Sequence, residues 1–207
     1  MGPWLIDLGG TLIDSLAVWD TCYRQAASKY GGMWPVPVKP ESSSVPAWAT
    51  ASLGGTGCDL TTVIREIEDA AACHFAEHGF ELLPGAAEFL EQLSSSRVSC
   101  ALVTATPHSV AKLFTDWLGT GPFLFVVSAD DVTEQKPAAE PYLLAASLME
   151  IAPADCIAVE DSPVGVASAL AAGIGTTIGV GPRHSELFEL GAVATFSQLA
   201  DLALLIP

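Results

Sequence analysis

Four groups of polar residues follow apolar runs that have the length of buried strands. They are Asp7-Leu8-Gly9-Gly10-Thr11, Thr104-Ala105, Lys136-Pro137 and Glu160-Asp161. Together they offer three carboxylates, one lysine and several hydroxyl groups. Such a set could hold a phosphate with the lysine and a divalent cation, while the carboxylates bind that cation. Hard oxygen ligands favour Mg²⁺ over Zn²⁺, so the residue types predict magnesium-dependent phosphate chemistry.

The segments that carry these groups alternate regularly along the chain. Apolar runs predict strands at 4–6, 98–103, 123–127, 156–159 and 176–180, and helical patterns cover 85–95, 108–117, 139–149 and 163–172, with a last helical segment ending near Leu205. This alternation predicts an α/β fold, a doubly wound parallel sheet of Rossmann-like type, built from residues 1–14 and 81–207. Ligands bind beyond the carboxyl ends of such strands, where the polar groups lie.

Residues 15–80 lack this alternation and predict a separate helical cap over the strand ends. Helical patterns cover residues 15–30 and 60–78, and each is followed by a glycine stop signal, at Gly31 and Gly79. Residues 31–60 hold several prolines and are predicted to be irregular.

The charge balance restricts the partners of the chain. Its 207 residues include 24 acidic and 8 basic side chains, which give a formal net charge of -16. A chain this acidic repels nucleic acid and anionic membrane surfaces, so neither is expected as a partner. The expected partner is a small phosphorylated metabolite, and the residues favour no particular oligomeric state.

The cysteines and the N-terminal segment predict a cytoplasmic protein. The five cysteines form no C-x-x-C pair and no Cys/His cluster with zinc spacing, which favours reduced thiols. No basic segment precedes the first apolar run, and Asp7 interrupts that run early, so no signal peptide is expected. No uninterrupted apolar stretch is long enough to span a bilayer.

The four polar groups, taken in order, resemble the four motifs of the haloacid dehalogenase superfamily. The stretch Asp7-Leu8-Gly9-Gly10-Thr11-Leu12-Ile13-Asp14-Ser15 is similar to the first motif, usually D-x-D-G-T-L-x-D-S. Thr104 and Lys136-Pro137 stand where the second and third motifs are expected. The fourth motif is matched by Glu160-Asp161-Ser162-Pro163-Val164-Gly165, in the form of the β-phosphoglucomutase and sugar-phosphatase branch. The resemblance covers nearly the whole chain.

The resemblance implies a role for each group. Asp7 would be a nucleophile that forms an aspartyl-phosphate. Thr104 and Lys136 would hold the phosphoryl oxygens, Asp161 would ligate Mg²⁺, and Glu160 would ligate it directly or through water. The remaining implied contacts with substrate would come from backbone N–H groups of the turn after Asp7 and from the second motif, namely Leu8, Gly10, Thr11 and Ala105.

One position departs from the family pattern. The family's second aspartate, the acid/base of its phosphatases, is Gly9 here. Gly9 keeps the backbone carbonyl that would ligate Mg²⁺ but has no proton carrier, and losing one typically costs about 10²–10⁴-fold in rate. Three explanations stay open: an enzyme whose acid/base comes from elsewhere, a binder of a phosphorylated ligand that does not turn over, and an engineered substitution. His108 could stand in for the acid or simply start its helix.

Other departures bear on the type of chemistry. Trp19 stands where mutases of this branch carry a histidine, which favours a phosphatase over a mutase. Phosphonate-cleaving members carry a small residue at the place of Gly9, but they also need a cap lysine. Lys29 and Lys39 are the only lysines of the cap, and neither stands at a matching place.

The cap offers further candidates that have alternative explanations. Arg65 could hold a distal anionic group or pair with acidic residues on its own helix. His74 and His78 lie four residues apart and could bind a metal, although surface or core packing is the better explanation. Trp34 and Trp48 could line a substrate pocket or pack within the cap.

Overall fold

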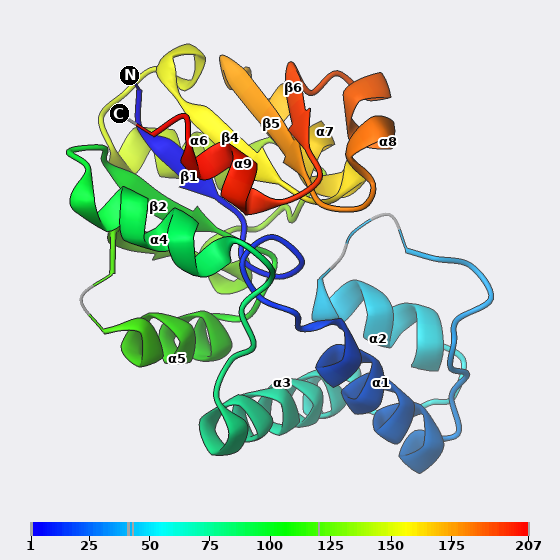
Figure 1. Cartoon of the computed structure of the whole chain (residues 1–207). Helices are drawn as coiled ribbons and strands as arrows, with labels where there is room; N and C mark the ends of the chain where they lie inside the picture. Colours follow the sequence, from blue (N-terminus) through cyan, green and yellow to red (C-terminus); the bar gives the residue numbers. More distant parts are fainter. Residues whose placement is uncertain (1, 41, 43, 120, 207) are drawn as a thin grey trace.

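Six parallel strands form one sheet in the computed structural model, which describes residues 2–40, 42, 44–119 and 121–206 (Figure 1). The sheet order is β3-β2-β1-β4-β5-β6. The strands are β1 (Trp4–Ile6), β2 (Cys100–Val103), β3 (Phe123–Val127), β4 (Ile157–Glu160), β5 (Thr176–Val180) and β6 (Ala194–Phe196). The predicted doubly wound α/β fold is confirmed, and its central strand β1 lies between β2 and β4.

Helices cover both faces of this sheet. They are α4 (Ala86–Ser95), α5 (His108–Leu118), α6 (Glu140–Leu148), α7 (Pro163–Ala171), α8 (His184–Glu189) and α9 (Leu199–Ala203). Successive side chains of a strand point to opposite faces. Trp4 and Ile6 accordingly join the apolar cluster that includes α4, α5 and α9, whereas Leu5 joins the cluster of α6 and α7. Burial on both faces explains why the strands are continuous apolar runs.

The helices α1 (Leu16–Tyr30), α2 (Val45–Leu53) and α3 (Leu60–His78), which we call the cap helices, lie beyond the end of the sheet toward which β1 runs (Figure 1). Helices α1 and α3 end at Gly31 (φ 74°) and Gly79 (φ 75°), as predicted, because glycine tolerates positive φ. The separation of a cap, residues 15–80, from a core, residues 1–14 and 81–207, stays a prediction.

Two elements differ from expectation. Residues 31–60 are not wholly irregular, because α2 forms there with Pro46 in its first turn, where proline is tolerated. The segment after β5 is not wholly helical either, since it contains the strand β6. The prediction for residues 31–60 was wrong in this respect, whereas the predicted last helical segment is present as α9, and β6 was not predicted; α2 and β6 are short and lack a strong periodic pattern.

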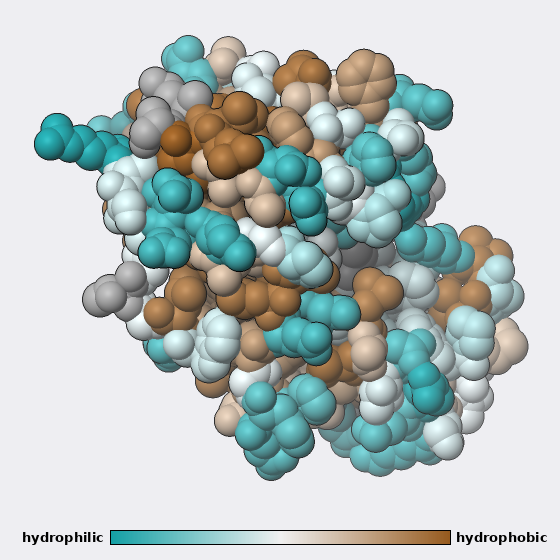
Figure 2. Space-filling model, viewed as in Figure 1, coloured by the Kyte–Doolittle hydropathy of each residue, from teal (hydrophilic) through white to brown (hydrophobic). Residues whose placement is uncertain are grey.

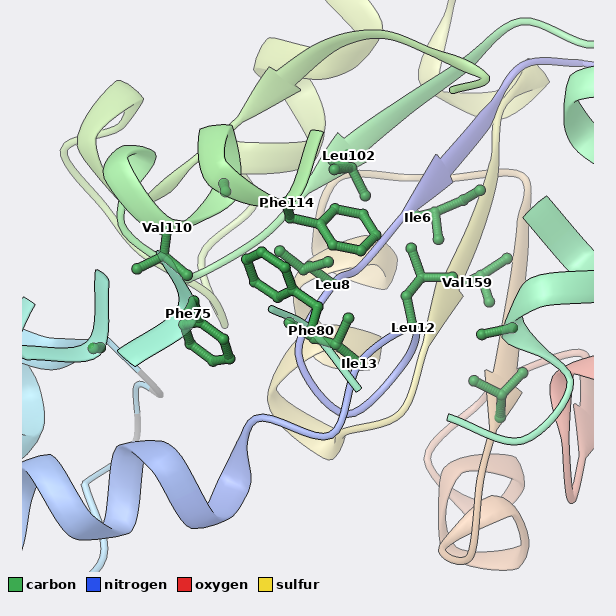
Figure 3. Close-up of a cluster of buried hydrophobic side chains, with 14 of the residues drawn as sticks. Ile6, Leu8, Leu12, Ile13, Phe75, Phe80, Leu102, Val110, Phe114 and Val159 are labelled. Atoms are coloured by element: carbon green, nitrogen blue, oxygen red, sulfur yellow. The ribbon is translucent and has the colours of Figure 1, made fainter. Parts of the chain in front are cut away.

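The end of α3 is joined to the sheet domain by aromatic packing (Figure 3). The rings of Phe75 and Phe80 stack with centroids 4.6 Å apart, and Phe80 meets Phe114 of α5 edge to face at 5.4 Å. The two chain segments that lead to and from the cap helices also pair, because the N–H of Leu83 donates to the carbonyl of Leu12 (2.9 Å). These ring contacts and this hydrogen bond hold the end of α3 and the two connecting segments against the sheet and α5.

Polar and apolar side chains are mixed over the face shown in Figure 2, with hydrophobic groups in small patches between hydrophilic ones. Within the described part of the chain, no helix has both the length and the apolar character needed to cross a membrane. Large apolar side chains are buried between the sheet and its helices and also among the cap helices.

Candidate active site

The candidate site lies beside β1, where the strand order of the sheet reverses. From β1 the chain adds β2 and β3 on one side and β4, β5 and β6 on the other. Ile6 pairs with Leu102 of β2 on one side and with Val159 of β4 on the other. Asp7, the next residue, therefore emerges between the carboxyl ends of β2 and β4, and its N–H donates to the carbonyl of Val159 (3.0 Å). Such a switch point is where open parallel sheets bind ligands.

Lys136 links the polar groups from its place in the loop after β3. Its side chain is only 3% exposed, and Nζ donates to Oδ1 of Asp7 (2.8 Å), to Oε1 of Glu160 (2.5 Å) and to the carbonyl of Val103 (2.7 Å). Burial by itself would lower the pKa of Lys136, but the two carboxylates outweigh it and raise this pKa. The lysine is thus held charged and pointing at Asp7.

Tyr142 of α6 completes the surroundings of Glu160 and was missed in the sequence. Its hydroxyl donates to Oε1 of Glu160 (2.6 Å), and both side chains are fully buried. A tyrosine within an otherwise apolar helix was the available signal, because a buried phenol needs a polar partner. Burial raises the pKa of Glu160 to about 7, although Lys136 opposes the shift.

Asp161 is half-buried and Thr11 is buried, and both lie beside Asp7. The Thr11 hydroxyl lies 3.2 Å from Oδ2 of Asp7 and 3.4 Å from Oδ1 of Asp161, and it can donate to one of them at a time. Burial, together with the nearby carboxylates of Asp7 and Glu160, raises the pKa of Asp161 well above its usual value. Lys136 forms ion pairs with Asp7 and Glu160, whereas no ion pair among the described residues joins Asp161 to a cation.

The donor set fits a divalent cation. One oxygen from each of Asp7, Glu160 and Asp161 lies within 4.8 Å of the others, the one such cluster of three or more metal-ligating side chains among the described residues. Three carboxylates face a single buried lysine, and Oε2 of Glu160 is buried without a hydrogen-bond partner. All three ligand atoms are oxygens, the donors that Mg²⁺ takes in proteins.

Magnesium is expected to stabilise the protein more at about pH 8 than at about pH 5.5. Burial raises the pKa of Glu160 from 4.5 to about 7, so the folded state binds more protons than the unfolded state between these values. Without metal, stability is therefore lost as the pH rises through that range. A cation on the ionised carboxylates restores it. Thermal unfolding with and without MgCl₂ at both pH values measures the effect, and equal gains in Tm would contradict it.

One backbone N–H group of the turn after Asp7 is hydrogen-bonded within the turn. The N–H of Gly10 donates to the carbonyl of Ile13 (2.9 Å), so this group is engaged within the turn. Gly10 has a φ of 86°, and a Cβ there would lie 2.3 Å from Oδ2 of Asp161. Its structural role is to let the backbone pass that carboxylate. The side chain of Leu8 is buried in the core (Figure 3), so only its backbone is available to a ligand.

Gly9 is surrounded by hydroxyl groups and not by a substitute acid. A Cβ at Gly9 would lie 2.9 Å from Oγ of Ser15 and 3.9 Å from Oγ1 of Thr106. In the described chain, these are the only atoms within 4 Å of that point outside the adjoining residues. His108 is exposed and begins α5, where its N–H donates to Asp130 (2.7 Å). Ser15 stands at the end of the first motif, but no role beside Gly9 was predicted for it or for Thr106.

The remaining predicted site residues differ in position. Thr104 is buried directly after β2, and its Oγ1 accepts from the N–H of Thr106 (3.1 Å) across the half-buried Ala105. Arg65 is exposed on α3 beside Asp59, and within the described residues no hydrogen bond or ion pair joins it to Asp7. The structure thus brings Thr104 to the site edge and does not join Arg65 to the cluster.

Gly165→Ala is expected to weaken Mg²⁺ binding and to lower the free energy of unfolding by about 1–3 kcal/mol. Gly165 lies in the first turn of α7, where a Cβ would lie 1.8 Å from Oε2 of Glu160, so the carboxylate must move. Titration calorimetry and denaturant unfolding measure the two effects. Gly55→Ala is the matched control, because nothing lies within 4 Å of a Cβ there. An unchanged Mg²⁺ affinity in Gly165→Ala would contradict the role of Glu160.

The other candidate ligands lie apart from this cluster. His74 and His78 are exposed on α3, and their rings stack with centroids 4.5 Å apart. Nδ1 of His78 is 3.0 Å from the carbonyl of His74, its own helix backbone. Surface packing, the explanation favoured by the sequence, describes them well.

Comparison with known proteins agrees with this geometry. A family model described as haloacid dehalogenase-like hydrolase matches residues 4–180. Hexitol phosphatase A of Escherichia coli (strain K12) is 30% identical over 178 residues, 82% of this chain and 79% of that protein. The phosphorylated carbohydrates phosphatase of Thermotoga maritima is 28% identical over 197 residues, 92% of this chain and 91% of that protein.

Solved structures show the same fold. The crystal structure of CbbY from Rhodobacter sphaeroides in complex with phosphate covers 98% of this chain and 96% of its own, with a TM-score of 0.82. Its sequence identity is 20%, so this likeness concerns the fold alone. The family model, in contrast, spans all four polar groups and most of the chain. The chain belongs to the haloacid dehalogenase-like hydrolases.

Proposed function

We propose that this chain is a Mg²⁺-dependent phosphohydrolase that acts on a small phosphorylated metabolite through an aspartyl-phosphate on Asp7. The observation that carries the proposal is the contact of Asp7 with the buried, charged Lys136 (2.8 Å) beside the carboxylates of Glu160 and Asp161. A lysine and a divalent cation together neutralise a phosphoryl group, while Asp7 attacks it.

Different residues would bind the metal, bind the phosphoryl oxygens and attack phosphorus. Glu160, Asp161 and Asp7 would hold Mg²⁺ with the carbonyl of Gly9, and the cation would neutralise charge on the phosphoryl oxygens. Lys136 and Thr104 would bind those oxygens, joined by the N–H groups of the turn after Asp7 other than that of Gly10, which is bonded to Ile13. An oxygen of Asp7 then bonds to phosphorus as the ester bond breaks. Water later attacks phosphorus and releases Asp7.

The named relatives support the substrate class. Two proteins similar along most of the chain are named as phosphatases, one of hexitols and one of phosphorylated carbohydrates. Trp19 also favours a phosphatase over a mutase, because no histidine is available at that place. Phosphonate cleavage is less well supported, since Lys29 pairs with Glu66 (2.7 Å) at the far end of α1, about 21 Å along the axis from Ser15.

Phosphorylation of Asp7 tests the proposal directly. The protein is mixed with MgCl₂ and acetyl phosphate, whose leaving group needs no proton, and a phosphoryl adduct is expected on the peptide that contains Asp7. Asp7→Asn and the omission of Mg²⁺ are the controls, and neither should give the adduct. If the wild-type protein shows neither an adduct nor phosphate release, the enzymatic proposal fails.

A second candidate is a binder of a phosphorylated ligand that does not turn over. Gly9 favours it, because the atoms around its missing side chain are hydroxyls and not titratable groups. This candidate predicts Mg²⁺-dependent binding of inorganic phosphate without an adduct. The adduct experiment therefore separates the two functions.

A further inference from the structure

The cap helix α1 carries aromatic residues on the face that begins at the active site. Ser15, whose Oγ would lie 2.9 Å from a Cβ of Gly9, immediately precedes α1. Trp19 follows one turn later, and its backbone N–H donates to the carbonyl of Ser15 (3.1 Å). Residues four apart share one face of a helix, so Trp19 and Tyr23 continue the face of α1 that starts at Ser15. Trp19 is only half-buried.

Other aromatic side chains pack beside Trp19. The ring of Tyr23 lies 6.2 Å from Trp19 and stacks on Trp34 at 4.9 Å, and Trp48 of α2 packs against both Tyr23 (5.9 Å) and Trp34 (5.3 Å). Nε1 of Trp34 donates to Asp20 (2.8 Å), which fixes the ring. These four residues, Trp19, Tyr23, Trp34 and Trp48, form a rigid wall that we call the aromatic wall.

The basic residues of α1 are already engaged. Arg24 pairs with Asp20, and Lys29 pairs with Glu66. Neither is left to bind a second phosphate on the substrate. Helix α1 itself therefore offers no free cation, and its aromatic wall suits an uncharged leaving group.

The surroundings of Gly9 set a second, independent requirement. Gly9 has no acidic side chain, and a Cβ there would meet the hydroxyls of Ser15 (2.9 Å) and Thr106 (3.9 Å), which can donate hydrogen bonds but are too weakly acidic to give up a proton. An alkoxide leaves poorly without protonation. A phenolate leaves far more readily, because a phenol has a pKa of about 10 whereas that of water is about 15.7.

We infer that the substrate of this site is an aryl monophosphate, whose leaving group stacks on Trp19 and departs as the anion. This inference rests on the proposed function. In the first step Asp7 bonds to phosphorus, and the ester oxygen keeps the electron pair of its broken bond and takes a proton from bulk water. In the second step water bonds to phosphorus, Asp7 is released, and the proton of the water passes to the departing phosphate.

A leaving-group series tests the inference on the wild-type protein. The kcat/KM values of p-nitrophenyl phosphate, phenyl phosphate and glycerol phosphate are measured at one concentration of Mg²⁺. Phenyl phosphate is expected to exceed glycerol phosphate by at least about 10²-fold, the usual contribution of a missing acid. Comparable values for the two would overturn the inference. The adduct of Asp7 with acetyl phosphate would still form, so that result would leave the proposed function standing.

Variants of Trp19 test the stacking. Trp19→Leu is expected to raise KM for phenyl phosphate about three- to tenfold, and by more than it raises KM for acetyl phosphate, which has no ring. Trp19→Phe keeps a ring and should stay within about twofold of wild type. Trp117→Leu, on α5, is the control for loss of an indole away from Ser15. Equal changes in KM for both substrates, or equal impairment by Leu and Phe, would overturn the stacking.

Discussion

Gly9→Asp is expected to raise the rate of alkyl phosphate hydrolysis by about 10²–10⁴-fold, the contribution of one positioned acid/base. The backbone can accept the side chain, because Gly9 is absent from the glycines with positive φ. The closest atom to a Cβ there is the hydroxyl oxygen of Ser15 (2.9 Å), which can rotate away. Steady-state kinetics with glycerol phosphate measure the gain, and aryl phosphates should gain less.

Two controls make this experiment specific. Gly9→Asn has nearly the same shape but cannot transfer a proton, so it should give no comparable gain. Gly10→Ala should lower activity, because that Cβ would lie 2.3 Å from Asp161 and the residue has a φ of 86°. If Gly9→Asp and Gly9→Asn behave alike, proton transfer does not limit this site.

Lys136→Met is expected to lower the free energy of unfolding by about 3–5 kcal/mol in the absence of Mg²⁺. The lysine side chain is 3% exposed and is paired with Asp7 and Glu160, so its loss leaves two buried carboxylates without their cation. Removing one partner of a buried pair is costly because the other charge stays desolvated. Urea unfolding monitored by circular dichroism measures the change.

Magnesium should recover part of this loss, because a cation held by the same carboxylates replaces some of the missing charge. Lys112→Met is the matched control. Lys112 pairs with Asp116 on the exposed surface of α5, so its removal should cost less than about 1 kcal/mol. Similar losses for Lys136→Met and Lys112→Met would contradict the structural role of Lys136. The Asp7 adduct should also fail to form in Lys136→Met.

The sequence predicted most of the fold because the physical signals are local. A strand buried on both faces must be an apolar run, and a helix that follows it must carry an apolar stripe, so their alternation defines the parallel sheet. Short elements give weaker signals, and α2 and β6 were missed for that reason. Their formation depends on packing against other segments of the chain.

The sequence by itself also determined which groups meet. Asp7 and Thr104 directly follow parallel strands and Glu160 ends one, and parallel strands end at one edge of the sheet, so these side chains had to converge. The absence of an acid at position 9 was equally visible, because it is a matter of residue type. These conclusions needed only the order of the elements and the chemistry of the side chains.

Only the tertiary structure decided how the groups are held. The contact of Lys136 with Asp7 joins residues 129 positions apart, and neither Tyr142 nor Gly165 was indicated as a neighbour of Glu160. Such contacts depend on helix placement to within about an ångström, which no local pattern specifies. The same is true of Ser15 and Thr106, whose hydroxyls are the groups that a Cβ at Gly9 would meet within 4 Å among the described residues.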